Sequence, residues 1–151
     1  MVLSLLSGGN IMYENYTKQA VPSRKYRELL GTAICVFNSN NAFVIENILR
    51  SDDNGQYDWY SLIDRESGKL KEPIQNTIAK KTNEKIGELF SEIVTMRNRI
   101  IHSFQITYDG QQILATKTRI KEGNQQFIIS EEYLLKFIKK NEELSSVLYR
   151  L

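Results

Sequence analysis

Apolar residues recur at helical spacing along three long stretches of the chain, and this pattern restricts the possible folds more than any other feature. The clearest stretch runs from about Ile74 to Phe104, directly after Pro73. A helix turns by roughly 100° per residue, so positions three, four or seven apart share one face. The apolar positions at this spacing are Ile74, Ile78, Ile86, Phe90, Ile93, Ile100 and Phe104. The pattern predicts one long helix, the longest in the chain, with this side buried.

Two further stretches predict long helices before and after it. Pro22 and Ser23 form a good helix start, because proline suits the first turn and serine can cap the backbone. Helical spacing continues to about Arg50, and residues 38–41 either kink one helix or separate two. The last helix begins near Ser130 and continues to the C-terminus. We also expect short helices within residues 11–20 and at Trp59–Ile63, and a loop at residues 67–69.

The pattern changes to strand-like alternation after the predicted long helix. Residues 105–108 and 111–118 alternate apolar and polar side chains. Asp109 and Gly110 lie between them and favour a tight hairpin. A turn at residues 122–124 precedes a third strand at residues 125–129. We therefore expect a mainly α fold, a helical bundle with a small three-stranded antiparallel β-meander before the C-terminal helix.

The composition is that of one ordinary domain. With 151 residues, 41% of them hydrophobic, and a net charge of +2, the chain can bury a core and has no strong overall field to attract nucleic acid. Residues 1–10 are expected to form a flexible N-terminal segment. Neither a signal peptide nor a membrane-spanning run is recognisable. We expect a single domain over residues 1–151 that is cytoplasmic and has no membrane partner.

Residue types that bind transition metals are scarce. The chain has one histidine and one cysteine, Cys35, which lies in an apolar run and is expected to be a buried thiol. The acidic segment that starts at Asp52 suggests a calcium loop, but Tyr57 takes the sixth position, where glycine is required. This segment is therefore expected to be a turn. Neither a metal nor a cofactor is predicted, although carboxylates alone would still suit magnesium.

The only histidine lies near the end of the predicted long helix, five residues after an arginine, in Arg97-Asn98-Arg99-Ile100-Ile101-His102. Asn98 and His102 continue a line of polar positions on one face of that helix. The earlier members of the line are Glu88, Ser91 and Thr95. The exposed face of an amphipathic helix normally carries charged residues, but this line ends in small polar groups and one imidazole. We therefore take the end of this helix as the candidate functional site.

The Arg-Asn-x-x-x-His pattern at the end of a long helix resembles the motif of the HEPN superfamily of small α-helical domains. The resemblance covers this motif and its helix. It implies a metal-independent endoribonuclease, usually dimeric, that acts as a toxin beside an antitoxin or as a phage-defence effector. Some members have lost activity and only bind. In the subgroup regulated by adenylylation, a Tyr follows the His by two positions; this chain has Phe104 there, so that regulation is not expected.

The residues of the motif suit cleavage of RNA through its own 2′-hydroxyl. Histidine exchanges protons near neutral pH, so His102 is the natural acid or base. Arg97 offers a planar, permanently charged fork to phosphate oxygens, and Asn98 can orient the imidazole of His102 or bind the phosphate. Four further cations are candidates for binding the RNA backbone: Arg99, Lys117, Arg119 and Lys121.

These residues also have simpler explanations. Cations are favourable near a helix C-terminus, so Arg97, Arg99 and His102 would stabilise the helix end without any chemistry. An inactive module that binds RNA, a nucleotide or a regulatory protein is the main alternative to a ribonuclease. A purely structural subunit is the other alternative, and separate salt bridges of Arg97 and His102 would favour it.

The spacing of the motif also bears on the oligomeric state. Arg97 and His102 are five residues apart, which separates them by about 140° on a regular helix. Both reach one phosphate only if the helix end distorts or a second copy completes the site. Two-fold pairing would bring both motifs around one cleft, and the resemblance points the same way. We therefore predict a homodimer whose motif helices face each other across the axis, with both His102 side chains in one shared basic cleft.

Overall fold

The computed structural model describes residues 13–151, so the N-terminal segment at residues 1–10 lies outside the described part of the chain. Residues 11 and 12 of the short helix expected over residues 11–20 lie outside it as well. The described remainder contains only one 3-10 turn, η1 (Tyr13–Tyr16). Glu14 of this turn is ion-paired with Arg27 at 2.9 Å, which attaches η1 to the first long helix.

The first long helix, α1, spans Arg24–Arg50. Ser23 caps it as expected, because its hydroxyl accepts a hydrogen bond from a backbone N–H of the first turn at 3.2 Å. Residues 38–41 do not divide it. Asn40 turns inward and donates a hydrogen bond to the backbone carbonyl of Asn141 at 2.7 Å. The polar residues in mid-helix are thus accommodated by packing against another helix.

The next segment contains the predicted turn and short helix. Asp52 accepts a hydrogen bond from the backbone N–H of Tyr57 at 2.8 Å, and Gly55 has a φ of 62°, which favours glycine. The short helix α2 spans Trp59–Ile63, and Asp58 caps it by accepting from the backbone N–H of Ser61 at 3.0 Å. Both predictions for this segment are confirmed.

The prediction of one long helix over residues 74–104 is wrong, and α1 is longer than any element there. Residues 67–101 contain a 3-10 turn where a loop was expected and then three helices: η2 (Ser67–Leu70), α3 (Lys71–Asn76), α4 (Ile78–Lys81) and α5 (Lys85–Ile101). Thr77 and Thr82 mark the breaks. Their hydroxyls donate to carbonyl oxygens four residues earlier, at 2.6 Å to Pro73 and 2.9 Å to Ile78. At both threonines the backbone leaves the helical region, with φ and ψ of −127° and −85° at Thr77 and of −128° and −98° at Thr82.

The predicted meander is confirmed. It contains three strands in an antiparallel sheet of order β1-β2-β3: β1 (Phe104–Tyr108), β2 (Gln111–Lys117) and β3 (Gln126–Ile128). Asp109 and Gly110 have φ values of 51° and 74°, the backbone of a two-residue type I′ hairpin. Phe104 begins β1 instead of ending a helix. Its side chain is 42% exposed, so the prediction that it is buried is wrong.

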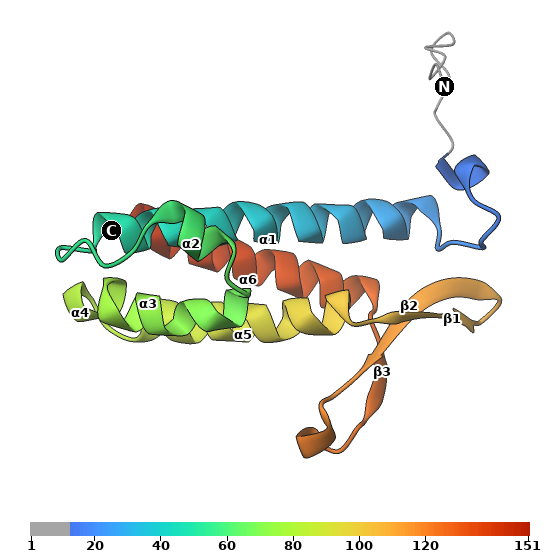
Figure 1. Cartoon of the computed structure of the whole chain (residues 1–151). Helices are drawn as coiled ribbons and strands as arrows, with labels where there is room; N and C mark the ends of the chain where they lie inside the picture. The colour runs from blue at the N-terminus through green and yellow to red at the C-terminus, as the bar shows by residue number, and fades with distance from the viewer. Residues whose placement is uncertain (1–12) are drawn as a thin grey trace, which may run out of the picture.

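α1, α5 and the last helix, α6 (Glu131–Tyr149), make up the body of the bundle (Figure 1). α6 runs parallel to α1. Near the start of α1, Tyr26 donates a hydrogen bond to Ile129, just before α6, and further along Asn40 donates one to Asn141 in the middle of α6. α5 runs the other way. The rings of Phe37, Phe90 and Phe137, one from each helix, stack in the core with centroids 6.5 and 6.1 Å apart. The structure thus has the predicted mainly α fold with a small meander before the C-terminal helix.

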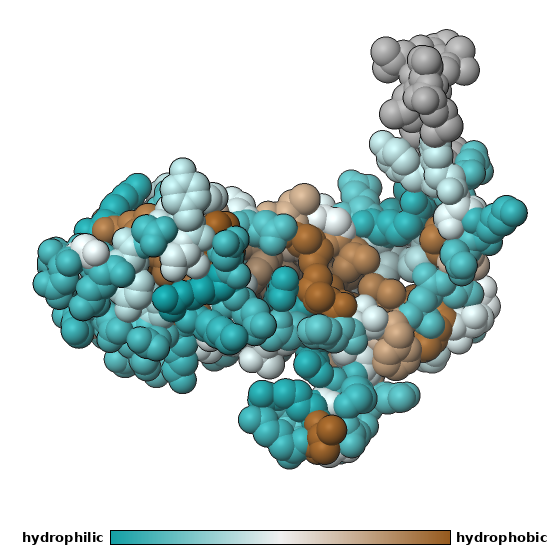
Figure 2. Space-filling model, viewed as in Figure 1, coloured by the Kyte–Doolittle hydropathy of each residue, from teal (hydrophilic) through white to brown (hydrophobic). Residues whose placement is uncertain are grey.

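The sheet extends from the end of the bundle where α5 ends and α6 begins (Figure 1). The connection from β2 to β3 contains a 3-10 turn, η3 (Ile120–Glu122), and projects away from the helices as a lobe. Figure 2 shows that this lobe is mostly hydrophilic, whereas hydrophobic side chains gather between α1 and the end of α5. Within residues 13–151, no helix combines the length and apolar character needed to cross a membrane.

Cys35 is exposed, so the prediction of a buried thiol is wrong. Its neighbours Ala33 and Phe37 are both buried. Cys35 lies two residues from each of them, roughly 200° around the helix, and therefore faces away from the core.

Candidate functional site

The motif occupies the last turn of α5. The helix ends at Ile101, and His102 follows as its C-cap, with its backbone N–H donating to the carbonyl of Asn98 at 3.0 Å. The hydroxyl of Ser103 donates to the carbonyl of Ile100 at 2.6 Å and satisfies another terminal carbonyl. The chain then enters β1 directly. The backbone around His102 is therefore held between a helix end and a strand.

Arg97 has two partners within the chain that fix its guanidinium. The guanidinium carbon lies 5.5 Å from the centroid of the Phe37 ring, within the range of a cation–π contact. Its Nη1 donates a hydrogen bond to Oδ1 of Asn98 at 3.2 Å. Arg97 is half-buried, so part of its planar fork remains accessible. Arg97 and Asn98 thus form one fixed polar pair beside the core.

His102 is exposed, and among residues 13–151 its imidazole has neither a hydrogen bond nor an ion pair. The structure therefore brings Arg97 to Asn98 and not to the ring of His102. This agrees with the angle of about 140° between the two positions on a helix. Separate salt bridges of Arg97 and His102, which would favour a purely structural role, do not form within the described residues.

The polar line of α5 faces a series of surface hollows between α5 and the η2–α3 segment. Ser91, Thr95 and Asn98 line a hollow of about 220 Å³, together with Lys71 and Arg119. We call it the α5 hollow. Arg119 comes from the connection between β2 and β3, so the meander closes one side of the hollow. Lys71 was not recognised as a candidate from the sequence, because no pattern links it to a motif that begins 26 positions later.

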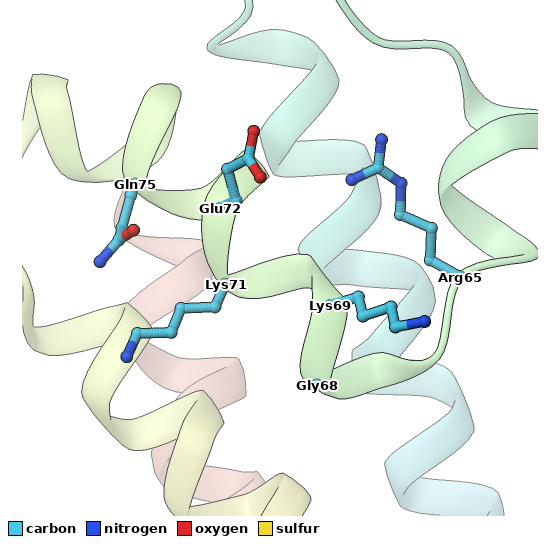
Figure 3. A pocket seen from close by; sticks show the side chains of 6 residues that line it. All are labelled: Arg65, Gly68, Lys69, Lys71, Glu72 and Gln75. Atoms are coloured by element: carbon cyan, nitrogen blue, oxygen red, sulfur yellow. The ribbon is translucent and has the colours of Figure 1, made fainter.

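Two larger hollows adjoin the α5 hollow at Lys71. One has a volume of about 590 Å³ and is lined by Arg65, Lys69 and Glu72 among others (Figure 3). The other, of about 360 Å³, is acidic and is lined by Glu84, Glu88 and Glu92 together with Lys71. In Figure 3 the side chain of Lys71 extends toward α5, while Lys69 and Arg65 lie on the other side of η2. The charge along this surface therefore changes from basic to acidic around Lys71.

Three of the four predicted RNA-binding cations gather near the end of α5. Arg99 donates from Nη1 to the backbone carbonyl of Lys117, and Nζ of Lys117 bonds to Oδ1 of Asn124 at 2.7 Å. Arg119 forms an ion pair with Glu122 at 2.7 Å. The hydrogen bond from Arg119, aided by the charge of Arg99, holds the pKa of Glu122 below its ordinary value. The fourth cation, Lys121, follows in η3 and is exposed on the lobe.

Within the described residues, no three His, Cys, Asp or Glu side chains are grouped closely enough to hold a metal ion. Comparisons with protein-family models, with curated proteins and with solved structures give no match. We therefore infer the function from the motif, its surroundings at the end of α5 and their chemistry.

Proposed function

We propose that the chain is a HEPN-type, metal-independent endoribonuclease whose site is built around Arg97, Asn98 and His102. One observation carries this proposal. A guanidinium fixed by Phe37 and Asn98 lies in the last turn of α5, and an imidazole without partners follows at the helix end. Metal-free RNA cleavage needs a prepositioned cation and a free proton-transfer group, and the end of α5 supplies one of each.

The reaction proceeds through the 2′-hydroxyl of the RNA. A base removes the hydroxyl proton, and the oxygen attacks the neighbouring phosphorus. The bond from phosphorus to the 5′-oxygen breaks, and an acid protonates that oxygen. The products are a 2′,3′-cyclic phosphate and a 5′-hydroxyl. His102 transfers protons, Arg97 stabilises the charge on the phosphorane, and Asn98 holds the Arg97 fork and binds the phosphate.

We propose that the active form is a homodimer with a composite site. Arg97 and His102 of one chain lie about 140° apart around α5, and two-fold pairing would bring the Arg97 of one chain to the His102 of the other. Apolar side chains beside the motif support such a contact. Ile101 is 46% exposed and Phe104 is 42% exposed, on either side of His102. Exposed apolar groups in this arrangement suit burial against a second copy.

The proposed cellular role is that of a cytoplasmic toxin or phage-defence effector, controlled by an antitoxin or another regulatory protein. The support is the resemblance of the motif. Phe104 takes the place of the tyrosine that can be adenylylated, so control is expected through a bound partner instead. Expression of the wild-type chain alone should slow bacterial growth, and the His102→Ala variant should relieve this effect.

The direct test is incubation of total RNA and transfer RNA with the purified protein in EDTA. We expect cleavage that leaves 2′,3′-cyclic phosphate ends, and a loss of about 10²- to 10⁴-fold in the His102→Ala variant. Lys139→Ala, which removes an exposed side chain from α6, is the control and should cleave at the wild-type rate. Cleavage by His102→Ala at the wild-type rate would overturn the assignment of His102.

An inactive RNA-, nucleotide- or protein-binding module is the second candidate. The observation that favours it is the engagement of Arg97 by Phe37 and Asn98, because an arginine with these partners also stabilises the bundle without any chemistry. Harmless expression of the wild-type chain, together with RNA that stays intact in vitro, would favour this function over the ribonuclease.

A further inference from the structure

The lining of the α5 hollow has the chemistry of an anion site. Lys71 and Arg119 supply two positive charges, and Ser91, Thr95 and Asn98 supply neutral polar groups. None of the residues that line this hollow is acidic. The adjoining hollow on the other side of Lys71 carries three glutamates instead. An anion at Lys71 is therefore drawn toward Asn98 and away from the acidic hollow.

The carboxamide of Asn98 has free donors, and Arg97 fixes their direction. Arginine has only donors, so the oxygen of Asn98 must face Arg97, and the amide nitrogen must face away from it. Among residues 13–151, no hydrogen bond uses that amide nitrogen as a donor. The hydroxyl of Thr95, by contrast, already donates to the carbonyl of Ser91 at 3.0 Å. The two N–H groups of Asn98 are thus available to a ligand.

The cations around Asn98 come from two separate segments. Lys71 extends toward α5 from the start of α3 (Figure 3). Arg119 uses Nε and Nη2 to bind Glu122, which leaves its Nη1 for another acceptor. Donors from α3, α5 and the meander therefore converge on a hollow of about 220 Å³. This volume is below the roughly 300 Å³ at which pockets for small organic ligands begin, and it suits a phosphate group.

We infer that the α5 hollow is a subsite for a phosphodiester of single-stranded RNA, one that neighbours the phosphate at the motif. Asn98 belongs to both places, because its oxygen accepts a hydrogen bond from Arg97 and the residue also lines the hollow. The inference rests on the proposed function and adds Lys71, Arg119 and the N–H groups of Asn98 as residues that position the substrate. It also gives the RNA strand a path over the surface, along the side of α5 that faces η2 and the meander.

The test measures RNA binding in EDTA by the full chain carrying His102→Ala, which binds without cleaving. A labelled single-stranded oligonucleotide is followed by fluorescence anisotropy at several salt concentrations. Adding Lys71→Gln should reduce the slope of log K against log salt by about 0.7, the value for one lost contact to a single strand. Arg119→Gln should do the same. Asn98→Asp should weaken binding by about 10- to 100-fold, because two donors are replaced by a negative charge.

Lys69→Gln is the matched control. Lys69 lies in η2, two residues from Lys71, but it points to the other side and lies 3.9 Å from Glu66. Its removal should leave both the affinity and the salt slope unchanged. Equal slopes for the Lys69→Gln and Lys71→Gln proteins, with affinities that match the parent protein, would overturn the inference.

Inorganic phosphate distinguishes RNA from a free anion as the ligand. Phosphate that displaces the oligonucleotide from the parent protein, and shifts the amide resonances of Asn98, supports the subsite. Phosphate that binds at Asn98 while all variants hold RNA equally would assign the hollow to a free anion and overturn the inference. If RNA binding depends on Lys71 but the wild-type protein cleaves no RNA, the subsite is supported and the proposal of a ribonuclease is overturned. Cleavage in EDTA with unchanged salt slopes would overturn the subsite alone.

Discussion

Asn40 and Asn98 lie in two helices of the same bundle, yet their side chains have opposite surroundings. Asn40 is buried between α1 and α6, where its amide donates to both the backbone and side-chain oxygens of Asn141, at 2.7 and 3.0 Å. Its oxygen accepts from the hydroxyl of Ser145 at 2.7 Å. Asn98 is half-exposed; Arg97 uses its oxygen, and its amide nitrogen has no acceptor in the described part of the chain.

The difference separates residues that hold the fold from residues that remain available for a ligand. A buried amide without partners is costly, so the cluster around Asn40 is complete and fixes how α1 and α6 pack. A half-exposed amide can bond to water, so the donors of Asn98 cost little in the absence of a ligand. Changes at the two sites should therefore affect different properties, stability at the first and RNA cleavage at the second.

The largest effect is expected at the Arg97–Asn98 pair. Arg97→Lys keeps the positive charge but removes the planar fork, so RNA cleavage in EDTA should fall by about 10²- to 10³-fold. The free energy of unfolding should change by only about 1 kcal/mol, the size of a lost cation–π contact. Parallel measurement of initial cleavage rates and urea unfolding checks both numbers. Unchanged cleavage would show that Arg97, like Asn40, serves the fold and has no role in the reaction.

The next largest effect is expected at the buried cluster. Asn40→Ala removes three hydrogen bonds and leaves a gap in the packing of α1 against α6, so urea unfolding should show a loss of about 2–3 kcal/mol. Asn38→Ala, on the exposed side of the same helix, is the control and should stay within about 0.5 kcal/mol. The cleavage rate of the folded fraction should be the same in both variants. A loss of cleavage beyond the loss of folded protein would contradict the separation of the two sites.

A smaller effect is expected at Tyr26, which joins α1 to the start of α6. Its hydroxyl donates to the carbonyl of Ile129 at 2.5 Å, so Tyr26→Phe should cost about 1 kcal/mol. Burial raises the pKa of Tyr26 above its ordinary value. A folded-state pKa above the unfolded value means that this stabilisation is complete below pH ~10 and is lost as the pH rises further. Unfolding free energies of wild type and Tyr26→Phe, measured at neutral and alkaline pH, should therefore converge above pH ~10.

The smallest change in stability is expected for Asn98→Ala. The loss of a half-exposed carboxamide should alter the free energy of unfolding by no more than about 0.5 kcal/mol. RNA cleavage should nevertheless fall, because the Arg97 fork loses one of its two fixed partners. Thermal melts and cleavage rates of the same preparation test this. A destabilisation as large as that of Asn40→Ala would show that Asn98 belongs to the fold and not to a site.

Local patterns were sufficient to predict α1, the Asp109–Gly110 hairpin and α6, because each has its own capping or turn residues. They were insufficient for α3, α4 and α5. The apolar spacing continues across the breaks, since Ile74, Ile78 and Ile86 face one core from three separate helices. The backbone leaves the helical region at Thr77 and Thr82, and threonine is not a strong helix breaker, so the residue types alone did not predict the breaks.

The candidate site divides in the same way. The motif is contiguous in sequence, so Arg97, Asn98 and His102 could be selected from their spacing alone. Lys71 could not, because its place beside Asn98 depends on how η2 and α3 fold back against α5. Arg119 was selected only as one of several cations in the meander. Its position in the α5 hollow depends on the projection of the β2–β3 lobe, which strand alternation does not predict.

The composite site can be tested by combining two inactive chains. Arg97→Ala and His102→Ala copies, carrying different tags, are expressed together, and the mixed dimer is purified through both tags. A site that takes Arg97 from one chain and His102 from the other contains one intact set in this dimer. We expect the mixed dimer to cleave RNA in EDTA at a substantial fraction of the wild-type rate, while each variant alone is inactive. A mixed dimer as inactive as its parents, or copies that never purify together, would contradict a site shared between two chains.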